Sequence, residues 1–248
     1  FSVAFGRNTN GSGVGIVIGG GEGNNTIISE YATISGGLNN TAFGNYTTIS
    51  GGKDNQIGFS GGDLYSSIGG GQNNKAPGAH STVPGGFNNE ATGIASFAAG
   101  KDAKAVTNGS FVWSDGTATE TSVNHNEFRA LATNGVIFTS GGGTATFSGG
   151  GWAFTSDRNK KENIIELDSR DSLEKIAQLP IYQFNYKTVD PEFISRGPMA
   201  QDWSPLFPSA KDPLSIDSMD VSGITLSALK GLLKRVEELE AAMTLLQG

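Results

Sequence analysis

Cysteine is absent from this 248-residue chain, and histidine occurs only twice, at His80 and His125. A chain without cysteine has neither a disulfide framework nor thiolate chemistry. Two histidines far apart in the sequence do not form the ligand set of a zinc site. We therefore expect no metal centre and no cofactor.

Positive charge and long apolar runs are also scarce. There are 17 lysines and arginines against 24 acidic residues, and a net charge of −7 does not suit binding to a phosphate backbone, which needs clustered cations. The sequence has no basic-then-apolar leader and no apolar run long enough to span a bilayer. We expect neither nucleic acid binding nor membrane insertion. Because the chain opens at Phe1 without a methionine, we expect a soluble mature piece or fragment.

Glycine, by contrast, is abundant, and much of it marks a repeat. With 37 glycines and only 36% hydrophobic residues, a single large mixed core is not expected. A unit of 15 residues recurs with its asparagines in register, and a version with four extra residues spans 56–74. The regular units are TIISEYATISGGLNN (26–40), TAFGNYTTISGGKDN (41–55), KAPGAHSTVPGGFNN (75–89) and EATGIASFAAGKDAK (90–104).

One column of this alignment predicts how the units stack. It holds an apolar residue followed two positions later by glycine: Ile34, Ile49, Ile68, Val83 and Ala98. We expect the column to be buried and the coils to form a β-solenoid, because their glycines and asparagines tolerate left-handed turns. Coils at the usual strand spacing would make a rod of about 35 Å. So thin a rod buries little by itself, and oligomerisation is expected.

The I-S-G-G-x-N-N and A-x-G elements of residues 1–112 resemble the head repeats of trimeric autotransporter adhesins. The resemblance implies a left-handed parallel β-roll, with three rolls side by side about a threefold axis. The pairs Asn39–Asn40 and Asn73–Asn74 are interpreted as stacked turn residues rather than glycan-binding residues.

Two other sets of side chains along the roll raise alternatives. An aromatic column is interpreted as a packing ladder at the roll surface or trimer seam, rather than a ligand platform; it consists of Tyr31, Tyr46, Tyr65 and His80. Scattered acids leave open a glycan-cleaving site between protomers, since two carboxyl groups across a groove suffice for that chemistry. These acids are Glu22, Glu30, Asp54, Asp63, Glu90 and Asp102.

Residues 113–154 change to alternating strands separated by glycine clusters. Such short strands predict a β-neck interleaved between chains, because each strand pair alone is too small to fold independently. Trp113 and Trp152 are interpreted as wedges at the two ends of this neck rather than sugar-stacking residues. The expected strands are 127–133, 135–140, 144–148 and 152–155.

Residues 155–220 carry less glycine and more charge, and predict a small mixed α/β domain. Ser172 is placed at the start of a short helix and Pro180 at its end. The expected elements are a helix at 172–179, a strand at 181–186, a loop leading into a helix at 197–203, and a strand at 214–217.

A heptad seam marks the C-terminal helix, 221–248. Its apolar residues are spaced alternately by three and four positions, and so few heptads make only a marginal isolated helix. We therefore expect the helix to pair with copies of itself, with one amphipathic helix packed on its own domain as the alternative. The seam consists of Leu229, Leu232, Val236, Leu239, Met243 and Leu246.

Four motifs precede the heptads: S-D-R-N-K-K-E-N-I, L-E-K-I-A-Q-L-P-I-Y-Q-F-N-Y-K, G-P-M-A-Q-D-W and L-S-I-D. In this order they resemble the self-cleaving intramolecular chaperone domain of bacteriophage tail spikes and fibres. Related domains occur on bacterial surface proteins and in membrane-tethered transcription factors. The resemblance implies a domain that assembles three chains and then cuts itself off before its serine, between Thr155 and Ser156.

Ser156 and Lys161 are the residues on which we place this cleavage. A serine hydroxyl needs a base, and lysine is available in a region without histidine. Being five apart, the two meet only if 157–159 form a turn. Lys161 accepts a proton near neutral pH only if burial or another cation favours the neutral amine, and a neighbouring chain would supply that burial. Asn163 and Gln201 are candidate oxyanion or supporting residues.

The sequence thus predicts a mainly β homotrimer, the C-terminal part of a tail or surface fibre, whose autopeptidase acts only on its own chain. It would be extracellular, on a phage virion tail, a contractile injection particle or a bacterial cell surface, with a host glycan or protein as candidate receptor. The alternative is a non-cleaving adhesin in which Ser156 caps a turn and Lys161 is a solvated charge. A β-branched Thr155 before the serine would slow attack.

Overall fold

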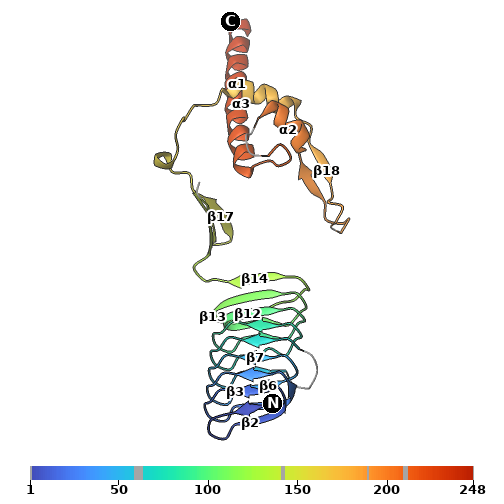
Figure 1. The fold of residues 1–248 in the computed structure, drawn as a ribbon. Coiled ribbons are helices and arrows are strands. Elements are labelled where there is room, and N and C mark those ends of the chain that lie inside the picture. Colours follow the sequence, from blue (N-terminus) through green and yellow to red (C-terminus); the bar gives the residue numbers. More distant parts are fainter. Residues whose placement is uncertain (1, 59–63, 141–142, 189, 209–211, 248) are drawn as a thin grey trace. The chain divides into compact units, whose positions relative to one another are not determined.

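The computed structural model describes residues 2–58, 64–140, 143–188, 190–208 and 212–247. It divides into two compact units, Phe1–Thr155 and Ser156–Gly248. The first unit contains a parallel β-solenoid and a three-stranded antiparallel sheet, and the second contains helices and a two-stranded sheet (Figure 1). In the described part of the chain, no helix is long and apolar enough to cross a membrane.

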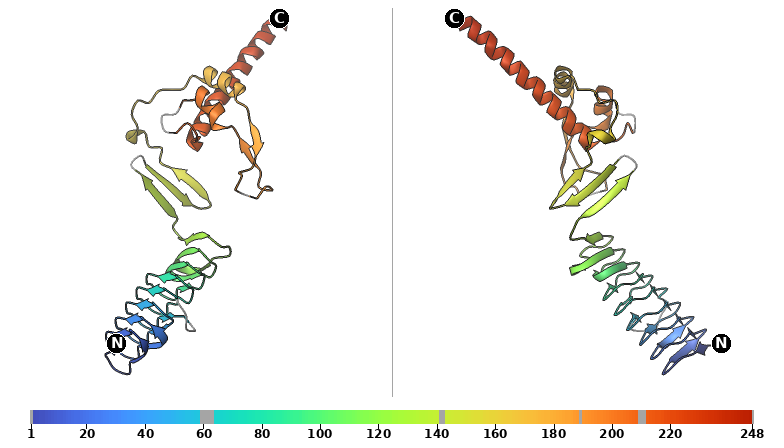
Figure 2. Two further views of the ribbon diagram at one scale, coloured as in Figure 1. Left: turned by 45° about the vertical axis from the view of Figure 1, so that its right-hand side comes forward. Right: turned by 90° about the vertical axis from the view of Figure 1, so that its left-hand side faces the viewer.

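The solenoid is a stack of about eight turns in which the strands of each coil pair in parallel with those of its neighbours (Figure 2). One row of strands is β1 (Val3–Ala4), β3 (Val17–Ile18), β5 (Thr33–Ile34), β7 (Thr48–Ile49), β9 (Ser67–Ile68), β10 (Thr82–Val83), β12 (Phe97–Ala105), β13 (Phe111–Thr121) and β14 (Phe128–Leu131). The others are β2 (Asn10–Val14), β4 (Asn25–Glu30), β6 (Thr41–Phe43), β8 (Gln56–Ile57) and β11 (Glu90–Ala91).

The predicted apolar column is confirmed as the core of the solenoid. All five of its residues are fully buried, and Ile18 and Val112 extend it at either end in the same register. Each coil adds one aliphatic side chain to this file, so neighbouring coils bury one another's apolar surface. The hydrophobic effect therefore acts between coils rather than within one.

Asparagine at the end of each coil forms a second, polar ladder inside the solenoid. Asn40 Nδ2 donates to the carbonyl oxygens of Gly36 and Gly52, both at 3.0 Å. Asn40 Oδ1 accepts from the amide of Asn55 at 3.1 Å. The residue before it, Asn39, has a left-handed backbone with φ of 55°. The asparagine pairs are turn residues, as predicted. The same buried ladder includes Asn24, Asn55, Asn74 and Asn89.

The solenoid continues beyond residue 112, where the repeat alignment ends. Strand β13 pairs in parallel with β12, and β14 pairs in parallel with β13. Segment 127–133, predicted as part of the neck, therefore supplies the last coil. The register sets Arg129 beside Val112 in the buried column. The repeat pattern did not predict this coil because an arginine stands where the other coils carry an aliphatic residue or alanine.

Three antiparallel strands follow the solenoid: β15 (Val136–Ser140), β16 (Gly143–Ser148) and β17 (Gly151–Phe154). The predicted strands of this region are confirmed, whereas their interleaving between chains stays a prediction. Trp152 packs against Phe138 and Phe147 within this sheet. Trp113 lies in β13 of the solenoid, so its predicted place at one end of the neck is wrong.

The second unit is a small α/β region with a long C-terminal helix. Strands β18 and β19 are antiparallel, and α1 packs against α3. Its elements are the 3₁₀ turn η1 (Arg158–Lys160), α1 (Ser169–Gln178), β18 (Tyr182–Phe184), β19 (Ser195–Gly197), α2 (Ala200–Leu206) and α3 (Ser218–Gln247).

Two boundaries in this unit differ from the predictions. Helix α1 begins at Ser169 rather than Ser172, because the Asp168 side chain accepts from the amides at the start of the helix. Residues 214–217 are not a strand. The Asp212 side chain holds a turn there, and the Asp217 side chain accepts from the amide of Met219 at the start of α3.

The packing inside the second unit is sparse. Among its described residues, the buried hydrophobic ones are Leu179, Trp203 and Ala228. Close packing of α1 on α3 depends on Gly231, where an added Cβ would lie only 2.1 Å from the carbonyl oxygen of Ser169. The heptad seam is left open: its side chains range from 43% exposed at Val236 to 87% exposed at Leu246. Self-association of the seam stays a prediction.

Candidate functional site

A tight turn brings Ser156 and Lys161 together. The Asp157 side chain accepts from the amide of Asn159 at 2.9 Å and so caps η1. The chain reverses over this turn, and Lys161 Nζ donates to Ser156 Oγ at 2.8 Å. The five-residue spacing is therefore bridged by a turn, while the catalytic roles of the two residues stay predictions.

The surroundings of this pair decide what it can do. Both side chains are exposed in the single chain. As a donor to the hydroxyl, the Lys161 amine cannot also remove its proton; it must first be neutral, which desolvation or nearby positive charge favours. Arg158 and Lys160 lie in the same turn and are the nearest cations in sequence. The amine and the hydroxyl are within hydrogen-bonding distance, but neither side chain is buried in the single chain.

Thr155, the residue before Ser156, is anchored to the three-stranded sheet. Its amide donates to the carbonyl oxygen of Thr144 at 3.0 Å. Its hydroxyl accepts from the amide of Thr144 at 3.1 Å and lies 2.8 Å from the Thr144 hydroxyl. The acyl side of the Thr155–Ser156 bond is thus fixed by side-chain as well as backbone contacts.

The two candidate oxyanion residues, Asn163 and Gln201, do not join the hydrogen bond between Ser156 and Lys161 in the described part of the chain. Asn163 follows the turn with a left-handed φ of 54° and is exposed. Gln201 lies in α2 and lines a cleft of about 640 Å³ together with Phe184 and Tyr186. Across the described residues, no hydrogen bond joins either side chain to Ser156 or Lys161. Their roles stay predictions.

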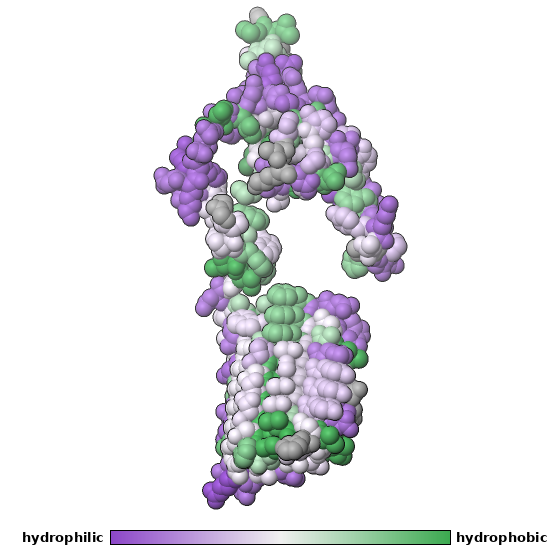
Figure 3. All heavy atoms as spheres, viewed as in Figure 1, coloured by the Kyte–Doolittle hydropathy of each residue, from purple (hydrophilic) through white to green (hydrophobic). Residues whose placement is uncertain are grey.

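The aromatic column of the solenoid is confirmed as a packing ladder. Successive rings from Tyr31 through Tyr46 and Tyr65 to His80 stack with centroids 5.4, 4.8 and 5.3 Å apart. Rows of similar residues run along the solenoid surface in the same way (Figure 3). Because each ring covers the face of the next, a sugar could not stack between them. The ladder is a structural feature, and its position at a trimer seam stays a prediction.

The scattered acids of the solenoid form contacts along the stack rather than facing pairs. Glu90 forms an ion pair with Lys104 at 3.4 Å, and Asp102 accepts from Asn88 at 2.5 Å. Asp63 lies outside the described residues. Within the described ranges, no group of three or more histidine, aspartate or glutamate residues is arranged to hold a metal ion.

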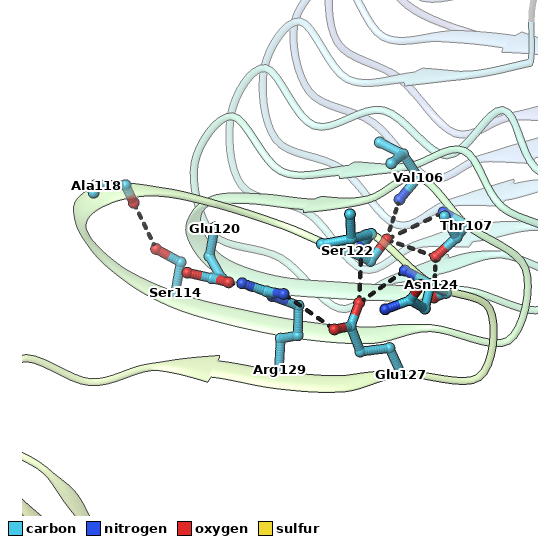
Figure 4. A network of polar contacts seen from close by, with 10 residues as sticks. Val106, Thr107, Ser114, Ala118, Glu120, Ser122, Asn124, Glu127 and Arg129 are labelled. Carbon is cyan, nitrogen blue, oxygen red and sulfur yellow. Dashed lines mark hydrogen bonds and ion pairs between the residues drawn. The ribbon is translucent and has the colours of Figure 1, made fainter. Parts of the chain in front are cut away.

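One polar cluster escaped the sequence analysis, at the last coils of the solenoid (Figure 4). Arg129 forms ion pairs with Glu120 and Glu127. Glu127 also accepts from the amides of Val123 and Asn124 at 2.8 and 3.1 Å, and these bonds lower its pKa. An arginine at the aliphatic position of the repeat was the signal that could have revealed it.

A second carboxylate in the same region is similarly held. Asp115 accepts hydrogen bonds from the hydroxyls and amides of Thr133 and Thr117, with the Thr133 hydroxyl contributing most, and its pKa is strongly lowered. Both carboxylates therefore stay ionised well below neutral pH. Asp115 and Glu127 thus hold neighbouring segments of the last coils in place through hydrogen bonds from backbone amides.

A comparison with known families covers the segment that contains Ser156 and Lys161. Residues 156–212 match the family model Peptidase_S74, described as chaperone of endosialidase. The match begins at Ser156, the first residue of the second compact unit. No curated protein matches the chain. The matched family comprises autoproteolytic intramolecular chaperones typical of self-cleaving phage fibre proteins. Near its C-terminus, this chain therefore carries a Peptidase_S74 chaperone domain, preceded by a β-solenoid.

Proposed function

We propose that this chain belongs to a homotrimeric fibre whose chaperone domain drives assembly and then removes itself by cutting between Thr155 and Ser156. The observation that carries the proposal is the 2.8 Å hydrogen bond between Lys161 Nζ and Ser156 Oγ, at the start of the family match. The compact units divide at this same peptide bond. One cut there would release the whole second unit.

The proposed reaction is an acyl transfer to serine followed by hydrolysis. Ser156 Oγ attacks the carbonyl carbon of Thr155 while Lys161, in its neutral form, takes the hydroxyl proton. The C–O bond forms, the C–N bond breaks, and the proton passes to the departing amine of Ser156. Water then hydrolyses the ester to give a Thr155 carboxylate and the free Ser156 hydroxyl. Activation of water by Ser156 in a direct hydrolysis would give the same products.

Assembly would control this reaction through the charge on Lys161. In the single chain the amine is exposed and donates to the hydroxyl. A neighbouring chain that covers the turn would desolvate the amine beside Arg158 and Lys160, and both effects favour the neutral form. Cleavage would then follow correct trimer formation, so that only assembled fibres lose the chaperone.

The second unit is also suited to bind copies of itself. It buries few hydrophobic side chains, and the α3 seam is open along its length. Exposed seams of this spacing associate as coiled coils. Further exposed apolar residues, such as Ile165 at 85% and Phe193 at 69%, would gain cover from adjacent protomers. The partner we propose is therefore this chain itself, in a threefold arrangement of left-handed β-rolls.

Mass analysis of native and denatured protein tests both parts of the proposal. The wild-type chain should form a trimer and, when denatured, give two fragments split between Thr155 and Ser156. Ser156→Ala and Lys161→Met should each give one intact band, whereas Lys187→Met, a matched control at an exposed lysine of the second unit outside this turn, should still give two. An uncut wild-type chain would overturn the autopeptidase proposal while leaving the trimer intact.

A non-cleaving trimeric adhesin is the second candidate, favoured by the exposure of both Ser156 and Lys161. It shares the trimer but keeps the chaperone attached, so the same denaturing analysis separates the two. In either case we place the protein outside the cell that makes it, with the phage tail fibre as the setting that the family match favours. A host-surface glycan or protein would be its receptor.

A further inference from the structure

The hydroxyl of Thr155 occupies an unusual place in the ladder between β16 and β17. The register pairs Ala145 with Phe154, which sets Thr144 opposite Thr155. The amide of Thr155 donates to the carbonyl oxygen of Thr144 at 3.0 Å. In an antiparallel pair of this type the two residues exchange both bonds, so the amide of Thr144 should donate to the Thr155 carbonyl.

The return bond goes to the side chain instead. The amide of Thr144 donates to Thr155 Oγ1 at 3.1 Å. The Thr144 hydroxyl forms a hydrogen bond with the same atom at 2.8 Å. Among the described residues none donates to the carbonyl oxygen of Thr155. The hydroxyl of Thr155 thus takes over a hydrogen bond that would otherwise hold its own carbonyl in the sheet.

The neighbouring backbone is shaped to accept this side chain. Gly143 precedes Thr144 with φ of 151°, and a Cβ built on it would lie 3.1 Å from the Cβ of Thr155. A side chain at Gly143 would therefore push against Thr155. The absence of a side chain there leaves room for the Thr155 hydroxyl to reach the Thr144 amide.

We propose that Thr155 is a specificity-determining residue for the self-cleavage, because its hydroxyl frees its carbonyl group for attack. The inference rests on the proposed function, in which Ser156 attacks this carbonyl. As the carbonyl carbon becomes tetrahedral, its oxygen needs donors placed for the developing charge, and a ladder bond would hold it elsewhere. If the Thr155 carbonyl had to give up a ladder hydrogen bond of ordinary strength before the attack, cleavage would slow roughly 3- to 10-fold.

Two substitutions at Thr155 separate the hydroxyl from the shape of the side chain. Thr155→Val keeps the branching and size but lacks the hydroxyl, so the Thr144 amide returns to the carbonyl and cleavage should slow roughly 3- to 10-fold. Thr155→Ser keeps the hydroxyl without the branching and should cleave at least as fast as the wild type. Thr146→Val removes a hydroxyl from the same strand, and is the matched control because, among the described residues, Thr146 forms no hydrogen bond with Thr155.

The measurement is the time course of fragment appearance on denaturing gels, with full chains assembled under the same conditions. Thermal unfolding of each variant in a Ser156→Ala background shows whether the fold is retained. Slow cleavage by Thr155→Val alone, with unchanged thermal unfolding, supports the inference. Equal rates for the valine variant and wild type, or equal slowing by Thr155→Ser or Thr146→Val, overturn it while self-cleavage stands. An uncut wild-type chain overturns both proposals.

Discussion

The two units of this chain stabilise themselves in different ways. In the solenoid, each coil is completed by the next: Asn40 bonds to both neighbouring coils, and Ile49 is fully buried between them. In the second unit, the seam side chains from Leu229 to Leu246 are at least 43% exposed among the residues that the structure describes. Under the proposed function, this difference would let the chaperone be removed without loss of contacts inside the solenoid. The solenoid is held by contacts between its own coils, whereas the second unit leaves much of its apolar surface exposed.

The largest effect is expected from substitutions that prevent the α3 seam from packing against other chains. Leu232→Asp combined with Val236→Asp puts charges into the coiled-coil core and should abolish the trimer, because buried unpaired charges are strongly unfavourable. Cleavage should be lost with it. Native mass analysis and denaturing gels measure the two effects. Ala241→Asp, on the face of α3 away from the seam, is the control; cleavage by a monomeric double variant would contradict control by assembly.

The next effect should fall on the solenoid alone. Ile49→Ala leaves a cavity in the buried column and should lower the free energy of unfolding by about 2–5 kcal/mol. Thr48→Ala, at the exposed position beside it, should change it by less than about 0.5 kcal/mol. Denaturant unfolding of the chains in a Ser156→Ala background provides the measurement. Loss of the trimer in Ile49→Ala would contradict the prediction that this substitution affects the solenoid alone.

A smaller effect is expected at the last coil. Arg129→Met keeps much of the side chain but leaves Glu120 and Glu127 without their cation, and should destabilise the solenoid by about 1–2 kcal/mol. Arg129→Lys retains the charge and should lose less. The same unfolding measurement applies, and stability unchanged in Arg129→Met would show that the carboxylates do not need the arginine.

The smallest effect is a dependence on pH. Backbone hydrogen bonds from Val123 and Asn124 lower the pKa of Glu127 from its ordinary value of 4.5 in the folded state. The ionised carboxylate therefore stabilises the fold above that value, and the contribution is lost as the pH falls through the lower folded pKa. Unfolding free energies between about pH 7 and pH 3 should decline more steeply for wild type than for Glu127→Gln. Parallel curves would contradict this.

The parts of the fold that the sequence predicted correctly are those with regular residue spacing. The column from Ile34 to Ala98 and the asparagine pairs predicted the solenoid, because a stacked array repeats its side chains in register. Where spacing changed, prediction failed: Arg129 interrupts the aliphatic column, and its coil was assigned to the neck. The meeting of Ser156 and Lys161 required a turn that their spacing only permitted. The bond from Thr144 to the Thr155 hydroxyl depends on strand register, which no local pattern disclosed.

Arg129 has a consequence for the length of the solenoid. An open end of a parallel stack is an exposed sheet edge, and another coil could add to it as strands add in aggregates. A coil placed beyond Arg129 would bury a charged side chain where the inner coils present isoleucine or valine. That burial is unfavourable unless new partners come with it. The arginine thus disfavours the stacking of a further coil at this end of the solenoid.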